Sequence, residues 1–282
     1  MSFAHGLETI VVATELSGCS EAALEYARKL AAAYGARIVL AHGIDPMEYA
    51  NVDALPDPVL SELTGKAREV LDRLSAGLLR EGIPSHSELR QGAVAQMLLD
   101  VARQYQAGLI VIGTKGMEGA GPVIVGAIAE QLVRQAPCPV LAVAADWNAG
   151  DFRPTPGGPV LLALERNEVA AASIATAASL ARVFERPLLM LHARTAEEAA
   201  ADPNPCEITM EKFSQQLCDG LPVRCIVKDG NPADAIVTEI AEDHPCILVV
   251  GVKRASGTPG PHGTAFALLA RSRVPVLCVP PH

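Results

Sequence analysis

The chain repeats itself, and this repeat constrains its fold more than any other feature. The segment VVATELSGCSEAALEYARKLAAAYGARIVLAHG, which surrounds Glu15, returns 150 residues later as LLALERNEVAAASIATAASLARVFERPLLMLHA, without a gap. Three shorter matches follow in the same order: LRQGAVAQMLLDVAR with VKDGNPADAIVTEIAE, LIVIGTK with ILVVGVK, and CPVLAV with VPVLCV. A unit of this length is far longer than a solenoid repeat, so the chain is predicted to hold two copies of one domain.

A segment rich in proline and glycine separates the two copies. Its sequence, DWNAGDFRPTPGGP over Asp146–Pro159, has no periodic apolar pattern and is typical of a linker. We therefore predict a first domain over residues 1–146, a linker over 147–158 and a second domain over 159–282. The total length of 282 residues agrees with two domains.

Short apolar runs alternate with helical patterns in each copy. In the first copy the runs predict strands over Thr9–Ala13, Ile38–Ala41, Leu109–Ile112 and Val140–Val143, and a weaker edge strand over His86–Leu89. The helical patterns cover Ser20–Ala33, Ser61–Leu79, Val94–Tyr105 and Ala127–Gln135, with Ser17 or Ser20 as the N-cap of the first helix. This alternation predicts an α/β fold, an open parallel sheet with helices on both faces. Ligands of such sheets bind beyond the carboxyl ends of the strands, so we expect functional residues just after Ala13, His42 and Ile112.

A glycine-rich segment follows the strand predicted at Leu109–Ile112. It reads GTKGMEGAGPVIVGA and leads into the helix predicted at Ala127. Glycines let main-chain N–H groups approach a phosphate, and a helix N-terminus attracts negative charge. Neither a Walker A motif nor G-x-G-x-x-G after the first strand is present. Taken alone, the segment therefore fits a flexible connection better than a phosphate site.

Several motifs taken together resemble the universal stress protein family: ATELS after the first strand, the helix SEAALEYA, VIGTKG and CPVLAV. The family motif G-x2-G-x9-G, followed by Ser or Thr, is matched by Gly113, Gly116 and Gly126, with Ala127 at its last position. The resemblance covers nearly the whole chain, once per copy. It implies two five-stranded parallel sheets of order 3-2-1-4-5, in the Rossmann-like architecture of the adenine-nucleotide alpha hydrolase-like proteins.

The resemblance also implies a nucleotide site in the first copy. Thr14 and Glu15 would approach the adenosine, and the backbone around His42 would face the adenine. The phosphates would lie on a set of residues from the glycine motif: Gly113, Gly116, Gly126 and Ala127. Lys115 either adds a positive charge to this site or is an ordinary solvated lysine. The implied ligand is ATP or a related adenine nucleotide, with Mg²⁺ or Mn²⁺ beside it.

The sequence departs from the family motif at two positions of the first copy. Glu15 stands where the family usually has Asp, so its carboxylate reaches one methylene further. Ala127 lacks the hydroxyl of the family's Ser or Thr, and a hydrogen bond to a charged group is worth about 1.5–3 kcal/mol. Its loss weakens phosphate binding about ten- to a hundredfold and leaves the main-chain N–H donors in place.

The second copy keeps less of the motif, since it reads GVKRASGTPGPHGTA. Gly251 is retained, Arg254 replaces the second glycine, and the segment up to Gly263 and Thr264 is shorter. We therefore expect the second copy to bind nucleotide poorly and to act as a pairing partner. The apolar runs Val140–Val143 and Val276–Val279 are predicted to pair and to form a pseudo-dimer within the chain, because an unpaired apolar edge promotes aggregation. A homodimer of whole chains is a further expectation.

Three other sets of matched residues allow two interpretations each. His42 and His192 lie at the ends of matching strands, and packing or capping is favoured over catalysis because no nucleophile or base accompanies them. Glu15 and Glu165 either bind ribose or are carboxylates attracted by a helix N-terminus. Cys138 and Cys278 are expected to be buried rather than reactive. The spacing of the seven histidines predicts no metal site.

Composition excludes several classes of function. The net charge of −9 and an aromatic content of 4% argue against binding of nucleic acid, and no apolar run is long enough to cross a membrane. Seven cysteines without C-x-x-C predict reduced thiols in a cytoplasmic protein. The favoured hypothesis is a tandem stress-response or signalling module that binds adenine nucleotide and hydrolyses it slowly, if at all, with an unknown protein partner.

Two rival hypotheses remain. One is a nucleotide-free interaction protein whose phosphate loops are relics. The other is an adenylating synthetase, which would need S-G-G-x-D-S, H-I-G-H or K-M-S-K-S elements that the sequence lacks.

Overall fold

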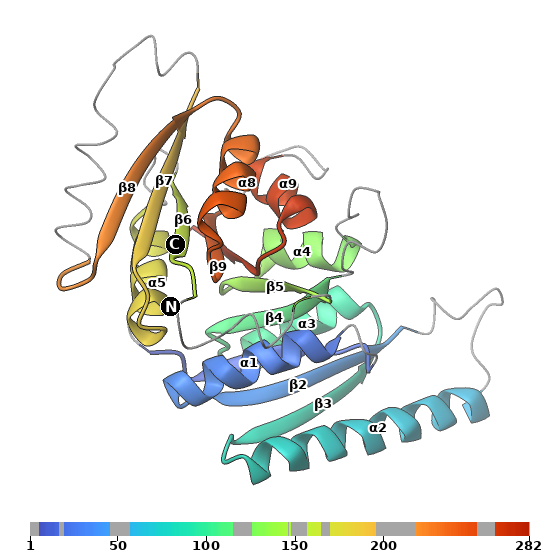
Figure 1. Ribbon diagram of the computed structural model, residues 1–282. Coiled ribbons are helices and arrows are strands. Elements are labelled where there is room, and N and C mark those ends of the chain that lie inside the picture. The colour runs from blue at the N-terminus through green and yellow to red at the C-terminus, as the bar shows by residue number, and fades with distance from the viewer. Residues whose placement is uncertain are drawn as a thin grey trace. The chain divides into compact units, whose positions relative to one another are not determined.

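The protein consists of two compact units, described here from a computed structural model (Figure 1). The structure describes residues 6–16, 20–45, 57–114, 126–145, 147, 157–164, 170–195, 218–252 and 263–281. The first unit holds the described residues from Leu7 to Ala145, and the second holds those that follow. This division agrees with two copies of a domain, while the bounds of the linker, 147–158, stay a prediction.

The first unit is built on a five-stranded parallel sheet of order β3-β2-β1-β4-β5. Its strands are β1 Thr9–Ala13, β2 Arg37–Ile44, β3 Ser85–Gln91, β4 Leu109–Thr114 and β5 Val140–Ala144. Its helices are α1 Glu21–Tyr34, α2 Asp57–Arg80, α3 Val94–Gln104 and α4 Ala127–Gln135. The order 3-2-1-4-5 confirms the predicted topology of this copy.

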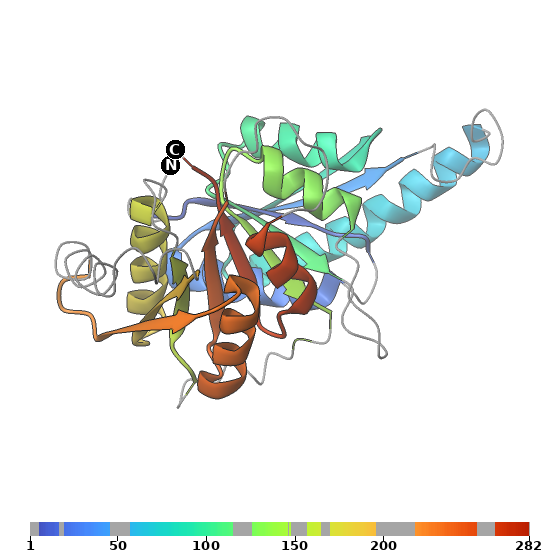
Figure 2. The same cartoon turned by 90° about the horizontal axis from the view of Figure 1, so that it is seen from above.

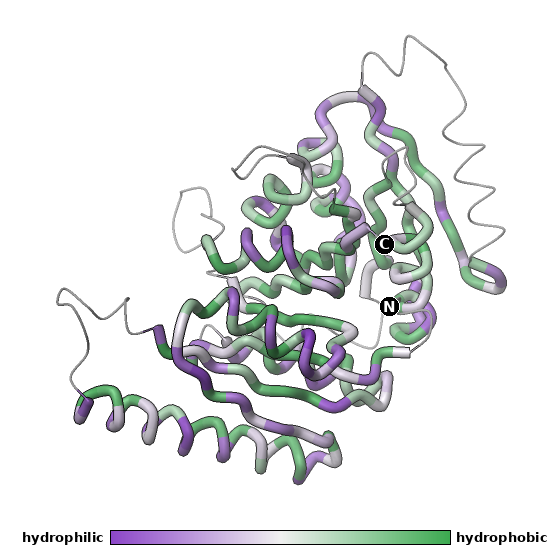
Figure 3. The backbone as a smooth tube through the Cα atoms, turned by 180° about the vertical axis from the view of Figure 1, so that it is seen from behind, coloured by the Kyte–Doolittle hydropathy of each residue, from purple (hydrophilic) through white to green (hydrophobic). Residues whose placement is uncertain are grey.

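Helices cover both faces of this sheet. Helices α1 and α2 lie on one face, and α3 and α4 lie together on the other (Figures 1 and 2). The central strands are therefore closed to solvent, and Ile10, Val11 and Val12 of β1 are fully buried. Figure 3 shows these strands as hydrophobic stretches, whereas α2 alternates between hydrophobic and hydrophilic turns. Parallel strands with both faces covered explain why the sequence has continuous apolar runs rather than an alternating pattern.

The second unit repeats this design. Its strands are β6 Val160–Leu164, β7 Leu188–Arg194, β8 Val223–Asp229, β9 Ile247–Gly251 and β10 Val276–Val279. They pair in parallel in the order β8-β7-β6-β9-β10, which is again 3-2-1-4-5. The described helices are α5 Ala170–Val183, α8 Pro232–Asp243 and α9 Thr264–Arg271. Among the helices of the described residues, none is long and apolar enough to cross a membrane.

Most predicted elements match the structure closely. Thr9–Ala13 and Ala127–Gln135 have the predicted bounds, and the weak strand at His86–Leu89 is edge strand β3. Several elements are longer than predicted, and the largest extensions are in β2, which continues to Ile44, and in α2, which starts at Asp57. Pro58 is compatible with that earlier start, since a proline in the first turn of a helix gives up no intrahelical hydrogen bond.

A polar network in the first unit holds edge strand β3 to the end of α3. The Tyr105 hydroxyl donates to Glu88 Oε1 at 2.5 Å, and Arg90 Nε donates to Glu88 Oε2 at 3.1 Å. Burial opposes ionisation of Glu88, but these two hydrogen bonds hold the pKa of its carboxyl below the ordinary value. Burial and the bond to Glu88 raise the pKa of Tyr105 to about 12.

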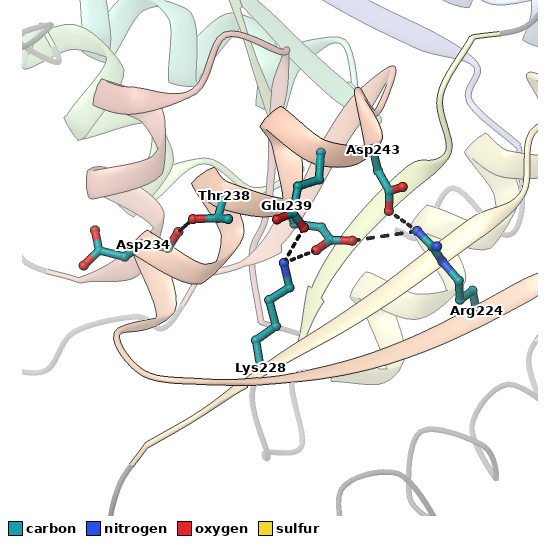
Figure 4. A network of polar contacts seen from close by, with 7 residues as sticks. Arg224, Lys228, Asp234, Thr238, Glu239 and Asp243 are labelled. Atoms are coloured by element: carbon teal, nitrogen blue, oxygen red, sulfur yellow. Dashed lines mark hydrogen bonds and ion pairs between the residues drawn. The ribbon is translucent and has the colours of Figure 1, made fainter.

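The second unit anchors its edge strand with the opposite arrangement of charge (Figure 4). Glu239 of α8 is 2% exposed, and its Oε2 lies 2.5 Å from Lys228 Nζ on β8. Glu242 also accepts from Lys228 at 2.7 Å, and Arg224 pairs with Asp243. The Lys228 ammonium donates to both carboxylates, and these hydrogen bonds raise its pKa, the one to Glu239 more than the one to Glu242. The central carboxylate is thus fully buried and on the helix here, whereas in the first unit it is partly buried and on the strand.

Candidate functional site

The carboxyl edge of the first sheet brings the ends of three strands together. The register pairs Ala13 with Ala41 and Val12 with Val111, so β1 ends between β2 and β4. The predicted site residues fall at this edge: Thr14 and Glu15 follow β1, His42 lies near the end of β2, and Gly113 lies near the end of β4. Strand order reverses between β1 and β4, which is where ligands of open α/β sheets bind.

The start of α4 faces the same edge. Helix α4 packs against β5 and ends at Gln135, five residues before β5 begins at Val140, so its N-terminus points toward the carboxyl ends of the strands. Gly126 is its N-cap residue, and among the described residues no side chain caps the helix there. Gly126 and Ala127 are both exposed. The first main-chain N–H groups of α4, together with the positive end of the helix dipole, are therefore open to an anion.

Six of the eight predicted binding residues lie in the described part of the chain, and the other two, Lys115 and Gly116, lie outside it. The six are Thr14, Glu15, His42, Gly113, Gly126 and Ala127. The structure puts all six at or next to the carboxyl edge. Their contacts with a ligand stay a prediction.

Thr14 lies at the centre of a hydrogen-bond network at the end of β1. Its N–H donates to Ala41 O at 3.0 Å, which extends the β1–β2 ladder by one residue. Its carbonyl oxygen lies 2.7 Å from His42 Nδ1. Its hydroxyl accepts from Leu16 N at 3.0 Å and lies 3.0 Å from Ser20 Oγ. The turn after β1 is thus fixed by main chain and side chain together.

This turn contains a strained residue that the sequence gives no sign of. Leu16 has a φ of 58°, in the left-handed region that residues with a Cβ seldom adopt. The left-handed conformation costs a residue with a side chain roughly 1–2 kcal/mol. Glu15, immediately before it, is exposed. The acidic residue in the first turn of α1 is Glu21, so Glu15 lies outside that turn, and both interpretations of Glu15 stay predictions.

Ser20, one of the two predicted alternatives, is the N-cap residue of α1. It has helical angles, however, and its side chain makes no capping hydrogen bond. Its hydroxyl lies against the Thr14 hydroxyl instead, because the turn after β1 brings Thr14 beside it. The alternative cap, Ser17, lies outside the described residues.

The end of β2 carries a glycine that the motif search missed. A Cβ on Gly43 would lie 2.8 Å from Met97 Cε and 3.1 Å from Val94 Cγ2, so α3 packs directly on the strand backbone there. The matching position in the second repeat is Ala193, and the residue that matches Met97 is the smaller Ala235. The first copy thus pairs a glycine with a large side chain where the second copy has two alanines. This difference becomes visible only when the two copies are compared.

Comparison with known protein families matches residues 6–144 and 158–280 to the Universal stress protein family. The chain belongs to this family. A universal stress protein of Thermus aquaticus is 32% identical over 138 residues, which cover 48% of this chain and 98% of that protein. A universal stress protein of Methanocaldococcus jannaschii is 29% identical over 136 residues, which cover 48% of this chain and 80% of that protein. Each of these relatives thus matches about half of the chain.

A solved structure matches both halves at once. The crystal structure of a universal stress protein from Archaeoglobus fulgidus has a TM-score of 0.78 and is 19% identical in sequence. The match covers 96% of this chain and 98% of the Archaeoglobus chain. At that identity the likeness concerns the fold, and it agrees with two universal stress domains in tandem.

The second universal stress domain keeps the scaffold of the site and loses part of its chemistry. His192 Nδ1 lies 2.9 Å from Leu164 O, which repeats the contact between His42 and Thr14. Both histidines therefore bond to strand ends, as the capping interpretation predicted. Leu164 stands where the first domain has Thr14, however, and has no hydroxyl. Thr264 begins α9, after Gly263 in the left-handed region, and Arg254 and Glu165 lie outside the described residues.

The cysteines that match between the domains are core residues. Cys138 and Cys278 are 3% and 1% exposed, and burial raises the pKa of each thiol to about 12. Such thiols are protonated and inert near neutral pH, as the sequence predicted. They lie beside or within β5 and β10 and take no part in the candidate site.

Proposed function

We propose that the first domain binds an adenine nucleotide, ATP or a close relative, at the carboxyl edge between β1 and β4. One observation carries the proposal: the exposed carboxylate of Glu15 and the uncapped, exposed N-terminus of α4 are presented at the same edge, where strand order reverses. A carboxylate suits ribose hydroxyls, and uncapped N–H groups suit phosphate. The resemblance of the Gly113–Ala127 segment to the family motif supports the same ligand.

The proposal assigns a part to each predicted residue. Thr14 and Glu15 approach the adenosine, where Glu15 accepts hydrogen bonds from the ribose, and the backbone near His42 lines the adenine. Gly113, Gly126 and Ala127 surround the phosphates, together with Lys115, Gly116 and a divalent cation, Mg²⁺ or Mn²⁺. The second domain, whose glycine motif is incomplete, binds nucleotide poorly and acts as a pairing partner.

We also propose that the chain serves as a cytoplasmic stress-response or signalling module whose two domains pair through β5 and β10. Both strands consist of apolar residues, and each is an edge of its own five-stranded sheet. Pairing would cover two edges that otherwise promote aggregation. Hydrogen exchange tests this: slow exchange of the main-chain amides of both strands is expected, and fast exchange in both would exclude the pairing.

A thermal shift with ATP and Mg²⁺ tests nucleotide binding, after the protein has been checked for nucleotide carried through purification. A ligand at a hundredfold over its Kd stabilises the folded state by about 2.7 kcal/mol. Gly126→Asp is the informative variant, because a Cβ there meets nothing within 4 Å and the φ of −63° suits any residue. Asp is a good N-cap, so it stabilises α4 while its charge repels phosphate.

The expected result is a Gly126→Asp protein that melts no lower than the wild type and has lost the ATP shift. Gly126→Asn is the matched control, since it caps the helix without charge and keeps more of the shift. Ala127→Ser restores the family's hydroxyl and is expected to tighten binding about tenfold. An ATP shift that is the same in the wild type and in Gly126→Asp would place the nucleotide elsewhere. No shift at millimolar ATP would favour a nucleotide-free interaction protein.

A further inference from the structure

The side chain of Thr14 is committed to the protein itself. Thr14 is 7% exposed, and each of its polar atoms has a partner within the first domain. The N–H bonds to Ala41, the carbonyl oxygen to His42, and the hydroxyl to Leu16 and Ser20. Because all of its polar atoms are already hydrogen-bonded, Thr14 has little capacity for direct contact with a ligand, although it directly precedes the exposed Glu15.

The hydroxyl of Thr14 supports the strained residue two positions further on. Leu16 adopts a φ of 58°, and its N–H donates to Thr14 Oγ1 at 3.0 Å. Ser20 Oγ also lies 3.0 Å from that hydroxyl and helps to hold it in place. Unfavourable backbone conformations persist only where the surroundings determine them, and here Thr14 supplies that support. Glu15 lies between the two residues, so its backbone direction depends on both.

We infer that Thr14 is a positioning residue, whose hydroxyl holds Leu16 in the left-handed turn and thereby presents the Glu15 carboxylate to the ribose of the nucleotide. This inference rests on the proposed function and changes the part of Thr14 in it, from contact to support. The second domain offers a natural contrast. Leu164 gives its carbonyl oxygen to His192 in the same way but has no hydroxyl.

Binding of adenosine and of ATP with Mg²⁺ to the full chain tests the inference, with calorimetry below the melting range. Thr14→Val removes the hydroxyl and keeps the shape, and it is expected to weaken both ligands by the same factor of about ten. Thr14→Ser keeps the hydroxyl and is expected to bind as the wild type does. Equal loss for the two ligands places the defect at the nucleoside and not at the phosphates.

A rescue variant separates positioning from direct contact. In Thr14→Val/Leu16→Gly, the glycine adopts the left-handed conformation without support. It is therefore expected to recover most of the affinity that Thr14→Val loses, whereas a lost direct contact would not return. Glu15→Gln in the Thr14→Val background is expected to weaken binding less than it does in the wild type, because both changes remove the same interaction. Amide exchange at Leu16, faster in Thr14→Val, reports on the turn without any ligand.

The outcomes separate the inference from the function beneath it. A wild-type protein that binds nucleotide, with Thr14→Val binding equally well or Leu16→Gly failing to rescue, would overturn the positioning role alone. A wild-type protein that binds neither ligand would overturn the proposed function and the inference with it. If Thr14→Val does not fold, Ser20→Ala replaces it, since it removes a group that helps to hold the hydroxyl in place, and a smaller loss shared by both ligands is expected.

Discussion

The Nδ1 atom of His42 lies 2.7 Å from the main-chain oxygen of Thr14, and this contact decides which imidazole nitrogen carries the proton. A carbonyl oxygen only accepts hydrogen bonds, so Nδ1 is the donor in this pair. The bond takes the place of the next rung of the β1–β2 ladder, just where the chain leaves β1. His42 thereby pairs the half-buried carbonyl oxygen of Thr14 at the point where β1 ends.

Removal of this donor is expected to destabilise the first domain. His42→Phe leaves the Thr14 oxygen without a partner, and a buried unpaired acceptor costs about 1–3 kcal/mol of unfolding free energy. Urea unfolding, monitored on the full chain, measures the loss. His42→Asn keeps a donor and should lose less, and His192→Phe is the matched change in the second domain. Equal stability of His42→Phe and the wild type would contradict the strand-end role.

Two glycines are expected to respond in opposite directions to alanine. A Cβ on Gly158 would lie 1.8 Å from His244 O and 2.5 Å from its carbonyl carbon, so the main chain must shift, and we expect Gly158→Ala to lower stability by several kcal/mol or to prevent folding. Gly65 lies inside α2 with nothing within 4 Å of its added Cβ. Gly65→Ala should therefore stabilise by about 1 kcal/mol, which is the difference in helix propensity. Thermal melts of both variants check this, and a neutral Gly158→Ala would show that β6 is not held against the end of α8.

Lys228 and Glu239 are expected to be coupled. Lys228→Met removes the nearest cation from the 2%-exposed Glu239 and leaves Arg224 at 3.7 Å, so it should destabilise the second domain by about 3 kcal/mol. The double variant Lys228→Met/Glu239→Val should recover most of that loss, because the first domain has Val101 at the matching position. Chemical denaturation of the four proteins gives the coupling energy. Additive losses would mean that the two groups act independently.

The same pair predicts a loss of stability in alkali. The pKa of Lys228 is raised above the ordinary 10.5 in the folded state, so its contribution is complete below that value. It disappears as the pH rises through the higher folded value. The gap in unfolding free energy between the wild type and Lys228→Met should therefore narrow above about pH 10.5. A gap that stays constant through this range would argue against the ion pair.

Glu88 predicts the opposite dependence for the first domain. Its folded pKa is lowered, so the stability it contributes is present above the unfolded value of 4.5 and is lost as the pH falls through the folded one. Tyr105→Phe removes the 2.5 Å hydrogen bond and should cost about 1 kcal/mol at neutral pH. The difference from the wild type should shrink in acid, as measured by urea midpoints across the pH range.

The strands and helices were predictable because they depend on local pattern. Thr9–Ala13 and Ala127–Gln135 have the expected bounds, since a buried parallel strand and an amphipathic helix each leave a direct signal in the sequence. The contacts that shape the candidate site left no such signal in the sequence. The Ser20 side chain bonds to Thr14 and not to the helix that Ser20 caps, and Leu16 is a residue type that usually avoids the left-handed conformation. Such features depend on residues that only the folded turn brings together.

The opposite placement of charge in the two edge-strand networks bears on how the tandem gene can change. Counted from Gly92 and Gly230, Val101 matches Glu239, and Glu88 matches Ile226. Recombination at these glycines would join the strand that carries Glu88 to the helix that carries Glu239, Glu242 and Asp243, and would combine acidic residues that the two domains now keep apart. The reciprocal product would set Lys228 against Val101. Exchange of sequence between the two halves would therefore be selected against at this point, which allows the duplicated domains to diverge.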